Sequence, residues 1–148
     1  LLEEDLLFVT APDAKGGDGP ISLAEALTHE LVIAGERGVI RNIVQGEARR
    51  LSLTLRLAYE VHSIGSMKAL IARGGGATIM PWSLAPKELR AGELKARRID
   101  RPAITRTLYL VRPAKRAPFS HEAEIRAFCD EIAARLLRAS APHARTLR

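Results

Sequence analysis

The chain has 148 residues and a formal net charge of +6, and aromatic residues make up only 4% of it. Hydrophobic residues account for 47% and charged residues for 27%, the balance of a globular domain that can bury a core. No run of apolar residues is long enough to cross a membrane. The first residues, LLEEDLLFV, lack the basic start and cleavage site of a signal peptide, and the single cysteine, Cys129, excludes an internal disulfide. We therefore expect a cytoplasmic protein without membrane association.

The positive charge is scattered along the chain. Lysine and arginine form only small clusters, at residues 49–50, 95–98 and 115–116, and no aromatic residues alternate with them to stack on bases. A solvated surface is therefore favoured over direct binding of nucleic acid by this segment.

In chain order, a continuous apolar run at residues 6–10 (LLFVT) predicts a buried strand that ends at Ala11-Pro12. Glu3, Glu4 and Asp5, just before it, are expected to be an acidic surface run with no partner that would tune one of them as a catalytic acid. A glycine-rich loop follows at residues 13–20, and then a short helix at 21–28, capped by the Ser22 hydroxyl.

Strands and helices alternate in the next part of the chain. A buried strand is expected at 31–34, a strand with alternating apolar residues at 55–61 and a further strand at 77–80. One helix is expected at 39–51, and another begins at Ser63 and stops at Gly74. This order, with its short connections, is typical of a parallel sheet. The fold class is therefore α/β, with a small, nearly complete doubly wound unit.

The remaining chain predicts a short helix at 86–91, strands at 94–99 and 107–111, and a frayed tail at 139–148. A long amphipathic helix is expected at 120–138, capped by Ser120. Its apolar stripe consists of Ile125, Phe128, Cys129, Ile132 and Leu136. The two outer strands, 6–10 and 107–111, and the long helix cannot bury themselves alone, so they imply part of a second lobe through which the chain passes twice.

Three loops are expected at the carboxyl ends of the parallel strands, where open α/β sheets bind ligands. They are residues 35–38, 62–66 and 80–83. A helix begins at the end of each of the first two loops. The free backbone N–H groups and the positive dipole ends of these two helices suit a small anion. Two alternatives stay open here: Ser63 is either a helix cap or a ligand contact, and Arg37 is either solvated or a ligand donor.

Residues for catalysis or metal binding do not come together in the sequence. The four histidines are far apart: His29, His62, His121 and His143. Cys129 lies on an apolar stripe, which predicts an inert core thiol rather than a nucleophile. Gly74 to Gly76 precede a strand and lack a following Gly-Lys-Ser/Thr, so they do not form a phosphate loop. We expect neither an enzyme nor a cofactor.

Most of the chain resembles the C-terminal effector-binding region of LysR-type transcriptional regulators. Among them, it is most similar to the nitrogen-assimilation-control subtype. The resemblance is carried by "LLEEDLLFVTAPD", "ISLAEALTHELVIAGERGVIRNIV", "VHSIGSMKALIARGGGATIMPWSLAPKELRAGELKARRI" and "TRTLYLVRPAKRAPFSHEAEIRAFCDEI". It covers residues 1 to about 138, and its most telling part is a hydrophobic helix, a glycine-rich turn, "ATIMP" and "GEL" followed by "RRI".

The resemblance implies a two-lobed fold like that of periplasmic binding proteins. Residues 13–102 would form one nearly complete doubly wound lobe, residues 1–12 and 103–138 part of the other lobe, and residues 139–148 a tail. Such regulators read DNA through an N-terminal winged helix-turn-helix domain, which this chain does not contain. They act as homo-oligomers, dimers or tetramers.

The resemblance also implies an effector site between the lobes, occupied by a small carboxylate or amino acid. Matched by motif position, its residues would be Arg37, Gly38, Ser63, Ser66, Met80 and Pro81. Thr10, at the end of a crossing strand, would lie near the hinge. The alternative is a periplasmic-type solute-binding domain of the same fold, which would hand its ligand to a transporter.

Overall fold

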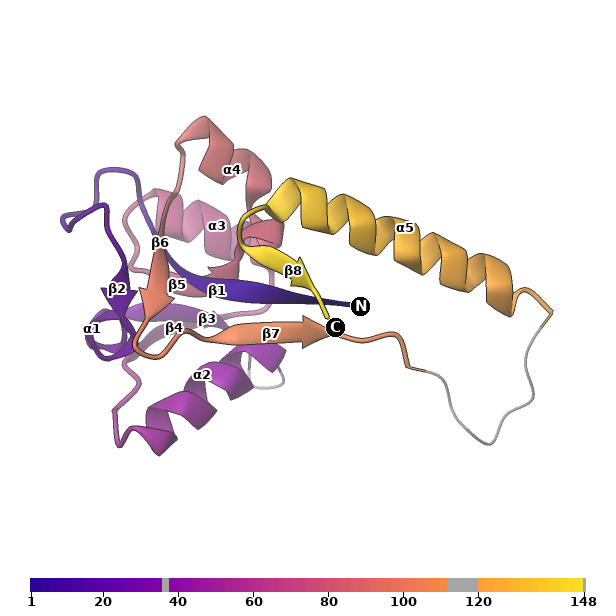
Figure 1. The fold of residues 1–148 in the computed structure, drawn as a ribbon. Coiled ribbons are helices and arrows are strands. Elements are labelled where there is room, and N and C mark those ends of the chain that lie inside the picture. Colours follow the sequence, from indigo (N-terminus) through magenta and orange to yellow (C-terminus); the bar gives the residue numbers. More distant parts are fainter. Residues whose placement is uncertain (36–37, 112–119, 148) are drawn as a thin grey trace.

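The structure is a computed structural model that describes residues 1–35, 38–111 and 120–147 (Figure 1). Its elements are β1 (Leu2–Thr10), β2 (Ile21–Ser22), α1 (Leu23–Thr28), β3 (Leu31–Ala34), α2 (Val39–Arg50), β4 (Leu57–Val61), α3 (Ile64–Ala72), β5 (Thr78–Pro81), the 3-10 turn η1 (Trp82–Leu84), α4 (Pro86–Ala91), β6 (Lys95–Asp100), β7 (Thr105–Leu108), α5 (Glu122–Ser140) and β8 (Ala144–Thr146).

The central strands lie in the order β2-β6-β1-β5, with β1 antiparallel to both β5 and β6. Strands β3 and β4 pair in parallel, and a parallel bridge between Leu31 and Ala77 joins β3 to the start of β5. Two backbone hydrogen bonds close that bridge: the Val32 N–H donates to the Ala77 carbonyl at 2.8 Å, and the Ala77 N–H to the Glu30 carbonyl at 3.0 Å. The three strands predicted to be parallel therefore run in one direction, as expected.

Strand β1 has two sets of partners along its length. Its second half pairs with β5 and β6, with Leu6 opposite Pro81 and Thr10 opposite Lys95. Its first half pairs with β7 and β8. Residues 6–10 therefore lie inside the same sheet as the doubly wound unit, and β1 changes partners between Asp5 and Leu6.

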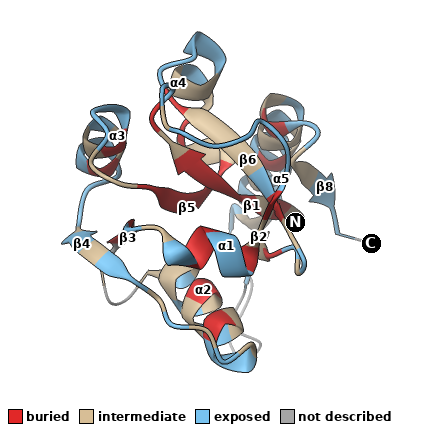
Figure 2. Ribbon diagram, turned by 90° about the vertical axis from the view of Figure 1, so that its left-hand side faces the viewer, coloured by how far each residue is buried: buried red, intermediate tan, exposed pale blue. Residues whose placement is uncertain are grey.

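Apolar side chains cover both faces of this sheet. Leu6 and Phe8 pack toward α1 and α2, whereas Leu7 and Val9 pack toward α3 and the region of α4. Figure 2 shows the buried strands β1 and β5 between these helix pairs. A strand buried on both faces needs an unbroken apolar run, which explains the LLFVT pattern.

The helix ends follow the sequence signals in three cases of four, at Ser22, Ser63 and Gly74. The Ser22 hydroxyl accepts a hydrogen bond from the Glu25 N–H at 3.1 Å, and Gly74, at φ +79°, follows the end of α3. The cap predicted at Ser120 is wrong: α5 begins at Glu122, with His121 at the N-cap position and no side-chain cap.

The predicted burial of the C-terminal part of the chain is also wrong. On α5, Ile125 and Phe128 are 46% and 62% exposed, and Cys129 is half-buried rather than in the core. The helix contacts the rest of the molecule near its C-terminal end and extends away from the sheet at its other end (Figure 1). Strand β7 ends at Leu108, so that Tyr109 and Val111, predicted to be buried, are exposed.

The expected tail is partly ordered into a strand. Residues 144–146 form β8, which pairs with the first half of β1, with Glu4 opposite Ala144. The Asp5 N–H donates to the His143 carbonyl at 2.8 Å. The apolar pattern of the tail is too short to reveal this pairing.

Candidate functional site

The carboxyl ends of β3 and β4 lie side by side. The Gly35 N–H donates to the Val61 carbonyl at 3.0 Å. A Cβ atom on Gly35 would lie 2.7 Å from Nδ1 of His62 and 3.3 Å from Oε1 of Glu60. Only glycine therefore lets the backbone lie this close to the end of β4 without displacing the imidazole.

Helix α2 begins shortly after Gly35, with Gly38 as its N-cap residue. The Gly38 N–H donates to the Gly35 carbonyl at 2.8 Å, and the Gly38 carbonyl accepts the Asn42 N–H at 3.1 Å. Gly38 is the N-cap residue, and no side chain caps α2. The amino end of α2 therefore carries the partial positive charge that attracts an anion. Arg37, predicted as an effector contact, lies outside the described residues.

The amino end of α3 follows β4 at the same edge. The Ser63 hydroxyl accepts the Ser66 N–H at 3.3 Å, and the Ser63 carbonyl accepts the Met67 N–H at 3.0 Å. Both serines are exposed. Ser63 is thus a helix cap, but its hydroxyl hydrogen remains available to donate to a ligand, so the capping role does not exclude binding.

The end of β5 presents a different surface from the one predicted. Met80 is fully buried and packs in the same apolar cluster as Val32, Met67 and Ile71, so its side chain supports the sheet edge from inside. Pro81, also buried, ends the strand. The next residue, Trp82, is half-buried and stacks on His143, with the ring centroids 5.3 Å apart.

A comparison with protein families gives a match along almost the whole chain. A family model described as the LysR substrate binding domain matches residues 1–137. The chain belongs to this family. A comparison with curated protein sequences gives no significant match.

Several solved structures share the fold of this LysR substrate-binding domain. The regulatory domain of MetR from N. meningitidis has a TM-score of 0.73 at 14% identity, over 100% of this chain and 67% of that chain. The effector binding domain of QuiR, solved in complex with shikimate, has a TM-score of 0.69 at 13% identity, over 91% of this chain and 64% of that chain. The CcmR regulatory domain from Synechocystis, in complex with 2-PG, has a TM-score of 0.65 at 18% identity, over 95% of this chain and 64% of that chain.

These likenesses establish a mixed α/β fold of the periplasmic-binding-protein kind. The chain spans about two thirds of the length of these solved domains. In the described part of the LysR domain, no helix is long and apolar enough to span a membrane. The same part contains no cluster of three side chains suited to hold a metal ion.

Thr10 does not lie with the other predicted site residues of the LysR domain. Because β1 and β5 are antiparallel, Thr10 lies beyond Val9, which is opposite Thr78 at the start of β5, whereas Leu6 is opposite Pro81 at its end. Thr10 is therefore at the far end of the sheet from the helix openings. The point at which β1 changes partners, at Asp5 and Leu6, is a better structural candidate for a hinge.

A buried ion pair at this point was missed by the sequence reasoning. Glu4 is 1% exposed, and its Oε2 lies 2.7 Å from Nε and 2.6 Å from Nη2 of Arg106 on β7. Nη2 also lies 3.2 Å from the Ser83 hydroxyl, just after β5. The acidic run is thus part of β1, and Glu4 links the crossing strands to the end of β5.

The neighbouring acids of β1 are paired as well. Arg145 on β8 forms ion pairs with Glu3 at 2.5 Å and with Asp5 at 2.7 Å. A hydrogen bond from Thr105, together with the Arg145 charge, lowers the pKa of Glu3 below its ordinary value. No sequence signal reveals these partners, because they lie more than 100 residues away along the chain.

Proposed function

We propose that this domain is the effector-sensing module of a LysR-type transcription regulator, and that it binds a small anionic molecule without transforming it. The observation that carries the proposal is the convergence of two helix amino ends, at Gly38 and Ser63, on the edge where β3 and β4 end side by side. Free N–H groups and aligned helix dipoles at one edge favour a carboxylate or the carboxyl end of an amino acid. The complexes of QuiR with shikimate and of CcmR with 2-PG support a small-molecule effector.

We assign direct contacts to the exposed groups at this edge. These are the free N–H groups in the first turn of α2, directly after its N-cap Gly38, and the hydroxyls of Ser63 and Ser66, with Arg37 as a proposed additional donor. Met80 and Pro81 are buried and would shape the edge rather than bind the effector with polar groups. The first shell would thus be mostly backbone and hydroxyl donors, which bind an oxyanion without catalysing a reaction.

The wider context of the module is also part of the proposal. Residues 13–102 would form one lobe and residues 103–138 part of the other. Residues 1–12 would cross between the two lobes, because residues 6–10 pair within the sheet of the first and residues 2–5 pair with β7 and β8. Residues 139–148 would be a C-terminal extension. DNA would be bound by a separate N-terminal domain in a cytoplasmic homo-oligomer. Within the family, we propose a nitrogen-assimilation-control type as the subtype that the sequence resembles. Membership in the LysR family favours this function over solute transport.

Effector binding would act through the two crossing segments. The Leu6 N–H donates to the Ile104 carbonyl at 2.9 Å, so that the outgoing and returning chains are joined where β1 changes partners. An effector that binds one arrangement of the lobes more tightly shifts the population toward it by that difference in affinity.

The proposal is tested by calorimetric titration and thermal unfolding of the protein with a panel of small carboxylates and amino acids. At least one of them should bind saturably and raise the melting temperature, because a ligand of the native state stabilises it by mass action. Replacement of Ser66 by alanine should weaken that binding without changing the fold. Absence of saturable binding across the panel would count against the proposal.

A further inference from the structure

A cavity lies at the edge of the sheet opposite the proposed effector site, where β3, β5 and β6 begin. Its volume is about 80 Å³, and its wall includes Phe8, Lys15, Gly16, His29, Lys95 and Arg97. It adjoins a larger cavity of about 320 Å³, which shares Thr10, Ala14, Lys15 and His29 with it.

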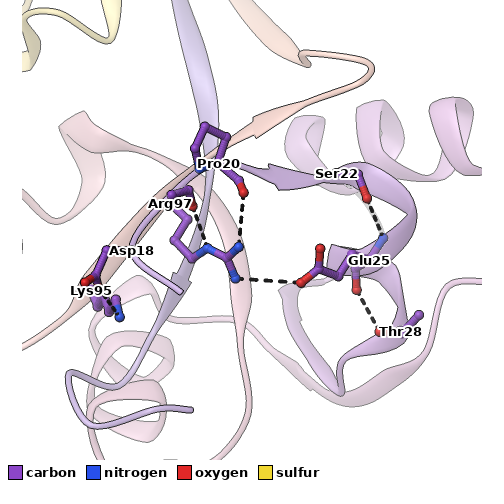
Figure 3. A network of polar contacts seen from close by, with 8 residues as sticks. Asp18, Pro20, Ser22, Glu25, Thr28, Lys95 and Arg97 are labelled. Carbon is purple, nitrogen blue, oxygen red and sulfur yellow. Dashed lines mark hydrogen bonds and ion pairs between the residues drawn. The ribbon is translucent and has the colours of Figure 1, made fainter. Parts of the chain in front are cut away.

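The guanidinium of Arg97 is nearly buried but only partly satisfied. Its side chain is 11% exposed, and it donates from Nε to the Gly19 carbonyl at 2.8 Å and from Nη2 to the Pro20 carbonyl at 3.1 Å (Figure 3). The remaining nitrogen, Nη1, has its carboxylate partner, Glu25, at 3.9 Å, beyond hydrogen-bond distance. A Cβ on Gly16 would lie 3.4 Å from Nη1, which places this nitrogen at the cavity wall.

Two lysines add to the positive charge of the cavity. Nζ of Lys95 lies 2.6 Å from Oδ1 of Asp18, a residue on the rim whose side chain is 93% exposed. That hydrogen bond lowers the pKa of Asp18. Lys15 forms no ion pair with any residue that the structure describes. Three cations therefore line a cavity whose only lining carboxylate is that of Glu25 among the residues described.

The loop backbone offers further donors. Within the described residues, the N–H groups of Gly16 and Gly17 donate to no backbone or side-chain acceptor, and both glycines line the cavity. Successive free N–H groups in a loop form a concave surface that binds anions. Such donors beside a partly satisfied arginine and a lysine without an acid partner form the recognition set for an oxyanion.

We propose that this cavity binds one small oxyanion group, a carboxylate or a phosphate, between Lys15, the Nη1 of Arg97 and the loop at Gly16. The small volume admits a single such group and excludes a nucleotide. The adjoining cavity at Thr10 and His29 accommodates the remainder of a small organic acid. This site is independent of the proposed effector site, because it lies at the opposite ends of the same strands.

The site is tested by titrating the protein with inorganic phosphate and, separately, with acetate, in calorimetry at constant ionic strength held with chloride. We expect saturable one-to-one binding of at least one of the two anions. Lys15→Gln should weaken that binding about tenfold, the effect of one lost charge-assisted hydrogen bond. Lys15 is the residue of choice because, unlike Arg97, it anchors no loop carbonyl.

Two matched variants separate this site from other sources of affinity. Arg98→Gln removes the same charge from an exposed residue next to Arg97, on the opposite face of β6, and should leave the dissociation constant unchanged. Ser63→Ala alters the proposed effector edge and should also leave it unchanged. The inference is overturned if neither anion binds saturably, if Lys15→Gln binds like the wild type, or if Ser63→Ala weakens binding as much as Lys15→Gln does.

Discussion

The carboxylate of Glu4 is held inside the molecule by Arg106, with Oε2 2.7 Å from Nε and 2.6 Å from Nη2. The two residues belong to the outgoing strand β1 and the returning strand β7. Arg106 also contacts the Ser83 hydroxyl at 3.2 Å. The ion pair therefore joins both crossing strands to the end of β5, next to the proposed effector edge.

Removal of one partner of this ion pair should strongly destabilise the folded protein. We expect Arg106→Met to lower the free energy of unfolding by about 3–5 kcal/mol, because it leaves the Glu4 carboxylate buried without its counter-charge. Replacement of both residues, Glu4→Leu with Arg106→Met, should recover much of this loss. Urea unfolding measures both values, and the partly exposed Arg145→Gln, expected to cost about 1 kcal/mol or less, is the control. Equal effects of Arg106→Met and Arg145→Gln would contradict this account.

The glycine-rich turn before β5 contains a second constraint. Gly76 has φ +117°, and a Cβ there would lie 2.7 Å from the Glu30 carbonyl oxygen, which is part of the main chain. Gly76→Ala should therefore destabilise the fold by about 2 kcal/mol or more, because both the backbone conformation and the contact oppose it. Thermal unfolding measures this loss.

Gly46 provides the matched control for that substitution. It lies within α2, and a Cβ there would meet nothing within 4 Å. Gly46→Ala should stabilise the protein by roughly 0.5–1 kcal/mol, because alanine loses less backbone entropy in a helix. If the two alanine variants unfolded alike, the close approach at Gly76 would not constrain the fold.

These features divide clearly into those that the sequence reveals and those that it does not. The buried strands at 31–34 and 77–80 and the cap at Ser63 were predictable, because apolar runs and capping residues act locally. Burial of Glu4 was not, because its partner Arg106 is 102 residues away. The α5 stripe was assigned to a core from its periodicity, but periodicity cannot tell what lies against a helix. The distance of Thr10 from the helix starts could not be predicted, because the direction of β1 depends on its non-local pairing.

The ion pair between Lys68 and Glu88 should make stability depend on pH. It joins α3 to α4 at 2.5 Å, and the hydrogen bond from Lys68 lowers the pKa of Glu88 below its ordinary value of 4.5. Because the folded protein holds this proton less tightly than the unfolded chain, the pair stabilises the fold above about pH 4.5, and this contribution is lost as the pH falls below it. Lys68→Gln should show a smaller loss of stability on acidification than the wild type. Parallel pH profiles of the two proteins would refute this linkage.

The two roles of Ser63 can be separated by substitution. Ser63→Ala removes both the cap and the hydroxyl donor and should cost about 1 kcal/mol of stability. Ser63→Asp keeps a capping oxygen but adds a negative charge at the effector edge, so stability should be retained while binding of an anionic effector is weakened. Equal affinity of the wild type and Ser63→Asp for such an effector would show that Ser63 only caps α3.

The most direct test of effector binding at this edge is a titration of the isotope-labelled protein, followed by backbone amide chemical shifts, with a carboxylate or amino acid that stabilises it. The account predicts that the largest shifts fall on Gly35, Gly38, Ser63 and Ser66, at the openings of α2 and α3. Largest shifts at the opposite edge, around Gly16 and Lys95, with these four amides unmoved, would contradict it.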